Sequence, residues 1–274
     1  MKKNLSTILL VIILLVGLGI LLYPSVSDYW NSFHQSQAIA SYSESVAHLT
    51  AEDYEKLWAD AEAYNRSILK REGNPLVLPE TDRARYESLL NLSDSGIMGY
   101  IEISKIGVSL PIYHGTSESV LQIAIGHLDH SALPVGGAST HCVLSGHRGL
   151  PSAKLLTDLD KMSEGDTFVL RVLNETLTYE VDQIRIVYPN EMDDLLITEG
   201  QDYCTLVTCT PYGINSQRML VRGVRTENDA SLSAARVTAD GLKIDPVLVI
   251  PFAAAPMLLL LLLGLLIFPG KKRR

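Results

Sequence analysis

The chain has 274 residues, of which 47% are hydrophobic and 20% are charged. This composition excludes collagen-like, low-complexity and disordered chains, and 3 cysteines are too few for a small domain held together by disulfides. Residues 28–245 carry 17 basic and 31 acidic residues, a net charge of −14, which argues against nucleic-acid binding because that requires a basic face.

The chain begins with a segment, residues 1–27, that we predict to be a membrane anchor with a cytoplasmic start. Residues 5–22 contain no charge and are long enough to cross a hydrocarbon core of ~30 Å. A cleaved signal peptide is the alternative, because Lys2 and Lys3 precede the apolar stretch. The stretch is longer than a typical signal core and lacks a small-x-small cleavage site after it, so an uncleaved anchor is favoured.

Helices are expected in the next two segments, residues 28–72 and 73–96. Thr50 is followed three residues later by Asp53, which is typical of a helix N-terminus. Apolar residues then recur at spacings of 3 and 4 up to Ile68, and this stripe predicts a face that packs on the main domain. Residues 73–96 are predicted to form a proline-bearing loop and a short helix at about residues 81–91.

Residues 97–226 form the main predicted domain, in which the hydrophobic period changes to 2. Seven or eight short strands with few helices predict a mainly β fold, a closed or nearly closed β-barrel. One short helix is expected at residues 153–162. The strands are expected at residues 100–103, 108–113, 140–144, 167–173, 177–187, 203–208 and 219–225.

The C-terminal part is predicted to contain a polar tether (residues 227–245), a second transmembrane helix (246–269) and a basic cytoplasmic tail (270–274). Residues 247–268 carry no charge. A processed anchor signal is the alternative, but the basic tail is typical of a retained stop-transfer sequence. Because basic residues beside a spanning helix stay on the cytoplasmic side, both termini are expected inside the cell and the middle domain outside.

Two clusters contain residues suited to catalysis. Residues 144–151 place His147 after a predicted strand, and residues 205–213 place Cys209 at the end of another, with Arg218 opening the next. A thiolate nucleophile, an acid–base histidine and a cation for an oxyanion are the components of acyl transfer. From residue type and spacing alone, structural core residues are an equally good explanation. No cluster has metal-ligand spacing, and no metal or other cofactor is expected.

Several motifs resemble those of the sortases of Gram-positive bacteria. Residues 205–209, Thr-Leu-Val-Thr-Cys, resemble the TLxTC signature of that family. The similarity covers roughly residues 97–226, and the second membrane span is also typical of the class C branch, which assembles pili. Further segments that resemble this branch are residues 110–116, 126–128, 133–137, 145–151, 209–213 and 218–223.

The resemblance implies an eight-stranded sortase-type β-barrel, here with N-terminal helices and two flanking transmembrane helices. It also implies a cysteine transpeptidase in which Cys209 attacks the Thr–Gly bond of an LPxTG-like sorting signal and forms a thioester. His147 would move the protons and Arg218 would hold the oxyanion. A Lys amine of the next pilin would then give an isopeptide bond. Thr208 is included as a substrate-binding candidate.

The expected partners are pilins or surface proteins with LPxTG-like signals, together with the lipid bilayer. Three other interpretations remain. The first is a sortase that attaches pili or surface proteins to the cell-wall peptidoglycan. The second is a hydrolytic cysteine protease, which would release peptide. The third is a non-catalytic adhesin, whose function would not depend on Cys209.

The segment before the barrel corresponds to the lid of class C sortases, which usually contains an Asp-Pro-aromatic triplet. No such triplet is present. Instead Leu78, Pro79, Glu80 and Thr81 match the first four residues of an LPxTG signal, with Asp82 in place of the scissile Gly. One interpretation is an extended lid that mimics substrate, since Pro favours an extended bend. The favoured alternative is a lid of other geometry, or an open site.

Cys142 and Cys204 lie five residues before His147 and Cys209, respectively. If the two strands run parallel side by side, as the resemblance implies, these cysteines are level with each other. A disulfide is geometrically and chemically feasible outside the cell, but two free thiols are favoured.

Overall fold

The computed structural model describes residues 2–70, 77–92 and 95–228. The predicted second transmembrane helix (246–269), the basic tail and nearly all of the tether lie outside the described residues.

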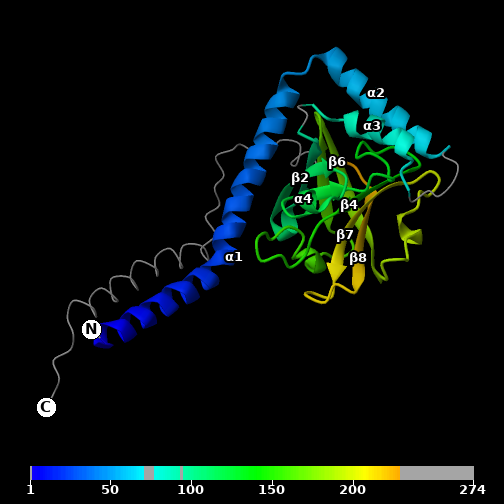
Figure 1. Cartoon of the computed structure of the whole chain (residues 1–274). Helices are drawn as coiled ribbons and strands as arrows, with labels where there is room; N and C mark the ends of the chain where they lie inside the picture. The colour runs from blue at the N-terminus through cyan, green and yellow to red at the C-terminus, as the bar shows by residue number, and fades with distance from the viewer. Residues whose placement is uncertain (1, 71–76, 93–94, 229–274) are drawn as a thin grey trace.

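The main domain is a closed barrel of eight strands in the order β1-β2-β3-β4-β7-β8-β6-β5 (Figure 1). The pairs β2–β3 and β4–β7 are parallel, and the remaining neighbours are antiparallel. This architecture confirms the predicted mainly β, eight-stranded barrel. The strands are β1 (Ile97–Ile103), β2 (Val108–His114), β3 (Ile125–His127), β4 (Thr140–Ser145), β5 (Thr167–Val172), β6 (Glu175–Val187), β7 (Asp202–Thr210) and β8 (Gln217–Arg225).

Alternation along the strands produces two apolar layers. Inward-facing residues such as Leu144, Leu206 and Val221 are fully buried in the main core. Their neighbours on the outer face, Val143 and Val207, belong to a second, smaller core. Because side chains at alternate strand positions share a face, this outer core lies on the same face of β7 as Cys209.

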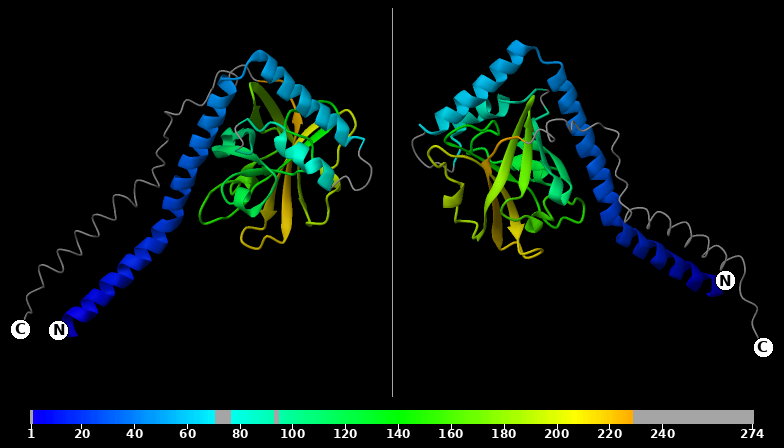
Figure 2. Two further views of the ribbon diagram at one scale, coloured as in Figure 1. Left: turned by 45° about the horizontal axis from the view of Figure 1, so that its top comes forward. Right: turned by 180° about the vertical axis from the view of Figure 1, so that it is seen from behind.

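Three helices precede the barrel, α1 (Lys2–Ala47), α2 (Ala51–Ile68) and α3 (Glu80–Ser88). Figure 2 shows α1 along one side of the barrel and α2 across one end. Thr50 Oγ1 accepts a hydrogen bond from the Asp53 backbone N–H (3.1 Å), which confirms the predicted cap of α2. The predicted stripe also packs on the domain, since Ala61, Tyr64 and Ile68 are buried in the main core.

Among the described residues, α1 is the one helix that is long and apolar enough to cross a membrane, judged by length and composition. The first part of α1 leads away from the barrel (Figure 1), and its most apolar stretch is not buried against the protein. Pro24 lies inside α1 and removes one intrahelical hydrogen bond, a common cause of helix bending. The helix fits the predicted anchor at residues 1–27, which stays a prediction.

One strand of the domain was not identified from the sequence, and one expected helix was wrong. The short strand β3 was not predicted, because three residues cannot display an alternating pattern. The helix expected at residues 153–162 is absent: this segment contains only the 3₁₀ turn η2 (Leu159–Lys161). Leu155 has φ of +39°, outside the right-handed helical range, so its side chain reaches the core from an irregular loop. The other short elements are η1 (Ser104–Ile106), α4 (Glu118–Leu121) and η3 (Asp193–Leu195).

Candidate active site

Cys209 and Arg218 are directly opposite each other on the antiparallel strands β7 and β8. Directly opposed residues present their side chains on the same face of a sheet, about 4.5–5.5 Å apart at Cβ. Both side chains are half-buried. Arg218 Nη1 donates to the backbone carbonyls of Asn215 (3.2 Å) and Gln217 (3.0 Å). None of the ion pairs among the described residues involves Arg218, so its charge is available to an oxyanion beside Cys209.

His147 follows β4, and the parallel pairing of β4 with β7 brings it to the same end of the barrel. Two hydrogen bonds tie the preceding residue, Gly146, to β7. The Gly146 N–H donates to Val207 O (3.1 Å), and Thr208 Oγ1 donates to Gly146 O (2.8 Å). The position of His147 is therefore set by contacts to the two residues immediately before Cys209.

Close packing under Gly146 restricts this position to glycine. A Cβ there would lie 2.6 Å from Ile125 Cδ1 and 2.8 Å from Leu156 Cδ1. Both neighbours are buried core side chains, so a larger residue would displace the turn that leads into His147.

The imidazole of His147 faces α4. Its Nε2 is buried, has no hydrogen-bond partner, and lies 3.8 Å from Glu118 Oε2. The backbone carbonyl of His147 accepts from the Leu156 N–H (3.1 Å), which closes the loop that follows it. The histidine is thus held between α4 on one side and this loop on the other.

The loops after Cys209 and after His147 pack on each other. Gly149 has φ of +76°, and a Cβ there would lie 2.8 Å from the ring of Tyr212. Glycine is favoured on both grounds, since the left-handed conformation strains other residues and the ring of Tyr212 would have to move to admit a Cβ. The ring of Tyr212 therefore lies between these two loops.

A groove of about 340 Å³ runs from Arg218 across this face of the barrel. Its floor includes Val207 and Leu220, and its walls come from the β6–β7 connection and from the segments after β2 and β3. Cys209 and His147 are not among the lining residues, but the groove reaches Arg218, the register partner of Cys209. Its apolar floor suits an extended peptide with apolar side chains. The groove is lined by Thr116, Leu121, Leu128, Asp129, His130, Ser145, Val187, Tyr188, Pro189, Glu191, Met192, Leu195, Val207, Arg218 and Leu220.

One wall of the groove carries a charged cluster. His130 Nδ1 lies 3.6 Å from Asp129 Oδ1, and Arg83 of α3 lies 3.4 Å from Asp129 Oδ2. The close approach of His130, followed by the charge of Arg83, holds the pKa of Asp129 below its usual value, although partial burial acts in the opposite direction. This wall therefore presents an ionised carboxylate at neutral pH.

Thr208, the substrate-binding candidate, does not line this groove. Its side chain is 2% exposed and points into the barrel, where its hydroxyl holds Gly146 O. Thr208 lies one residue before Cys209, so strand alternation turns it to the opposite face. In the structure, the Thr208 hydroxyl supports the turn that leads into His147.

Replacing Thr208 by Val is expected to destabilise the protein by ~1–3 kcal/mol, because it removes the hydroxyl donor from the Gly146 carbonyl while preserving side-chain shape. Chemical denaturation measures the loss, and we expect a lower kcat as well. Thr210→Val is the matched control. Thr210 is buried on the same face of β7 and makes no side-chain hydrogen bond among the described residues. Equal losses in both variants would contradict a specific role for Thr208.

The segment expected to mimic an extended substrate has a different conformation. Leu78 is 5% exposed and packs in the main core, and α3 begins at Glu80 with Thr81 in its first turn. Glu80 pairs with Arg83 of the same helix (3.0 Å), and none of these residues or Pro79 lines the groove. An extended mimic is therefore wrong, because Glu80 and Thr81 are helical. A lid of other geometry and an open site remain as the alternatives.

Cys142 and Cys204 are register partners on β4 and β7, as predicted, and both are buried free thiols. Burial and the hydrogen bond with Cys142 raise the pKa of the Cys204 thiol well above its usual value. The neutral thiol is a poor nucleophile, so Cys204 is unreactive where it lies.

We expect the intact mass to be the same with and without reductant, since a disulfide would remove two hydrogens. Alkylation provides the complementary count. Native protein is expected to take one alkyl group, on the half-buried Cys209, and unfolded protein to take three. A non-reduced chain lighter by two hydrogens would show that the pair is oxidised.

Comparison with known proteins agrees with this geometry. A family model described as "Sortase domain" matches residues 101–226. The structure of sortase C1 from Streptococcus agalactiae is 52% identical with a TM-score of 0.68, over 70% of this chain and 100% of that one. Sortase C from Streptococcus pneumoniae is 42% identical with a TM-score of 0.63, over 70% and 97%. Sortase C from Clostridium perfringens with its C-terminal cell wall sorting motif is 42% identical with a TM-score of 0.62, over 70% and 99%.

The chain therefore belongs to the sortase family, whose members are cysteine transpeptidases. Its close structural matches are class C sortases from several Gram-positive bacteria.

Proposed function

We propose that the protein is a membrane-anchored transpeptidase that cleaves LPxTG-like sorting signals and joins pilin subunits through isopeptide bonds. The observation that carries this proposal is the placement of Cys209 opposite Arg218, with the turn into His147 bonded to the two preceding residues of β7. Two relatives support the substrate class. One structure is described together with pilin substrate specificity, and another contains a cell wall sorting motif.

In the first half-reaction, the Cys209 thiolate attacks the threonine carbonyl of a signal bound in the groove. Arg218 stabilises the negative charge on the carbonyl oxygen, because no carboxylate among the described residues competes for its guanidinium. His147 gives a proton to the departing glycine amine, and a thioester to Cys209 remains.

In the second half-reaction, a lysine amine of the next pilin attacks the thioester. His147 accepts the proton from that amine, the Cys209 sulfur leaves, and an isopeptide bond joins the two subunits. The apolar floor at Val207 and Leu220 would receive the leucine and proline of the signal.

The proposed location is the cell membrane, with the catalytic domain outside the cell and both termini cytoplasmic. The exposed apolar part of α1 supports the N-terminal anchor, and the basic residues at both ends of the chain support the orientation. A protease-protection experiment on intact cells tests this, since only the barrel should be accessible from outside.

The decisive experiment supplies the full-length protein with a pilin that bears an LPxTG-like tail. A ladder of covalent polymers linked through lysine is expected on a denaturing gel, and Cys209→Ala serves as the negative control. Monomers linked to peptidoglycan would support the wall-attaching alternative. Release of cleaved pilin without polymer would indicate a protease.

A further inference from the structure

His147 lies between two segments that carry no strand hydrogen bonds of their own. One is the loop that starts at His147 and runs to residue 158, and the other is α4 with the turn that follows it. The closing bond from the Leu156 N–H to His147 O and the bond from the Gly149 N–H to Thr157 Oγ1 (3.1 Å) organise the loop internally. Neither bond fixes the loop to the barrel. The loop contacts the barrel on its inner side, through the buried side chains of Leu155 and Leu156.

Helix α1 makes hydrogen bonds to both of these segments. Asp28 Oδ1 accepts from the Lys154 N–H (2.6 Å), and Asn31 Nδ2 donates to Ser152 O (2.8 Å). One turn further along, Gln35 Nε2 donates to Ile123 O (2.7 Å), directly after α4. The three side chains recur at spacings of 3 and 4, so they lie on one face of the helix.

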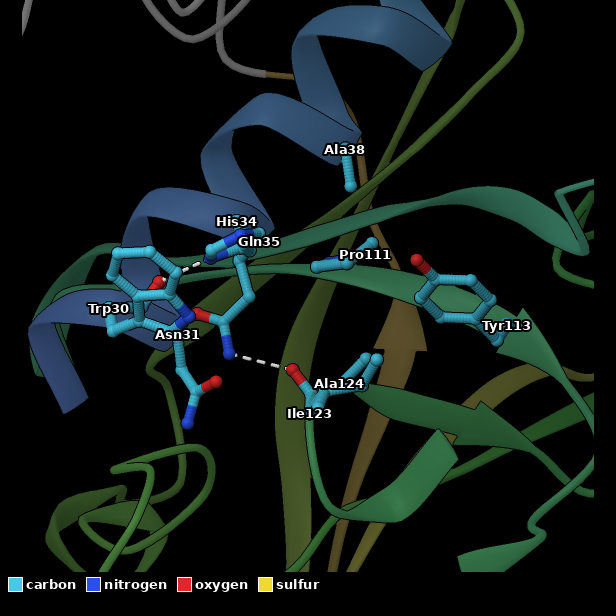
Figure 3. Close-up of a pocket in the computed structure, with 9 residues that line it drawn as sticks. All are labelled: Trp30, Asn31, His34, Gln35, Ala38, Pro111, Tyr113, Ile123 and Ala124. Carbon is cyan, nitrogen blue, oxygen red and sulfur yellow. Dashed lines mark hydrogen bonds between the residues drawn. The ribbon is translucent and has the colours of Figure 1, made fainter. Parts of the chain in front are cut away.

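Apolar packing does not hold α1 against the barrel at this level. A cavity of about 260 Å³ separates the helix from the barrel, with Trp30 and His34 on one side and Pro111, Tyr113 and Ile123 on the other (Figure 3). The dashed bond between Gln35 and Ile123 in Figure 3 reaches from the helix to the opposite wall. In this part of α1, hydrogen bonds between its side chains and backbone atoms of the two segments therefore set the distance between them.

We infer that Asp28, Asn31 and Gln35 form a clamp on α1 that positions His147 by fastening the segments on both of its sides. The inference rests on the proposed catalytic role of His147. Since the clamp follows the apolar stretch of α1 directly along the chain, the anchor helix itself holds the catalytic histidine in register with Cys209. A displacement of about 1 Å at a catalytic group is enough to reduce turnover ~100-fold.

Removing the clamp should leave the fold intact. Further along α1, Ile39, Tyr42 and Val46 are buried in or against the core, and the Tyr42 hydroxyl donates to Met98 O (2.9 Å). The helix is therefore expected to stay docked, while the loop after His147 loses its hydrogen bonds to α1.

The test uses full-length protein in detergent micelles and a fluorogenic Leu-Pro-Glu-Thr-Gly peptide. The triple variant Asp28→Ala, Asn31→Ala, Gln35→Ala is expected to lower kcat about 10-fold with little change in KM, because α1 does not line the groove. Hydrogen exchange should accelerate at the amides of Gly149 and Leu156 but not along β7. Asp28→Asn retains the acceptor oxygen and should keep the wild-type kcat.

The matched control is Ser32→Ala with Ser36→Ala. Both hydroxyls lie on the same stretch of α1 but donate only to its own carbonyls, at Tyr29 and Ser32. The clamp is disproved if the triple variant keeps wild-type kcat and exchange, or if the serine control loses as much. His147→Ala in the same assay separates the two hypotheses. If His147→Ala is active, the proposed chemistry is wrong. If His147→Ala is inactive and the triple variant keeps full activity, only the clamp is disproved.

Discussion

Replacing Cys209 by Ala is expected to abolish cleavage of the sorting-signal peptide and the formation of covalent pilin polymers. No other cysteine can substitute, because Cys142 and Cys204 are buried inside the barrel. The side chain of Cys209 is half-buried at a strand end, so its loss removes little packing and the unfolding midpoint should change little. Peptide cleavage, polymer ladders and thermal unfolding measure the three quantities.

Cys142→Ala is the matched control for the Cys209 experiment. It removes a buried thiol from the main core, so it should lower stability while leaving the peptide-cleaving chemistry in place. Normal polymer formation by the Cys209→Ala protein would exclude Cys209 as the nucleophile.

Replacing His147 by Ala is expected to reduce kcat by ~10²–10⁴-fold, the usual contribution of a general acid–base group. The side chain is held beside α4 with its Nε2 buried, 3.8 Å from Glu118 Oε2 and without a hydrogen-bond partner. No hydrogen bond therefore has to break before this atom takes part in proton transfer. Single-turnover measurements with the fluorogenic peptide should show slower thioester formation at unchanged peptide affinity.

His48→Ala is the corresponding control, because His48 is exposed just beyond the end of α1 and far along the chain from both β4 and β7. Its activity should equal that of the wild type. A His147→Ala enzyme that retains more than about half of the wild-type kcat would be incompatible with an acid–base role.

Most of the strands and the long helices could be predicted from local patterns. Alternation of apolar residues identified seven of the eight strands, and the Thr50 cap with its stripe identified α2. These signals can be read from the sequence, because each strand or helix must present an apolar face to the core and this fixes the spacing of its apolar residues. The motifs around His147 and Cys209 pointed to the pair of strands that carries the candidate site.

Local pattern failed where side chains far apart in the chain decide the structure. The leucines near residue 155 have helical spacing, yet the chain there is an irregular loop, because its path is set by His147 and the core. Residues 78–81 match part of an LPxTG-like sorting signal, yet Leu78 is buried in the core and Glu80 begins a helix.

The sequence alone determined the strand content, the family resemblance and the three residues proposed for catalysis, because these depend on residue types at short spacings. Only the tertiary structure placed Cys209 opposite Arg218, turned Thr208 inward to Gly146, 62 residues away, and brought Asn31 to Ser152, 121 residues away. Contacts over such separations depend on barrel closure and on the docking of α1, and no local preference of the backbone encodes them.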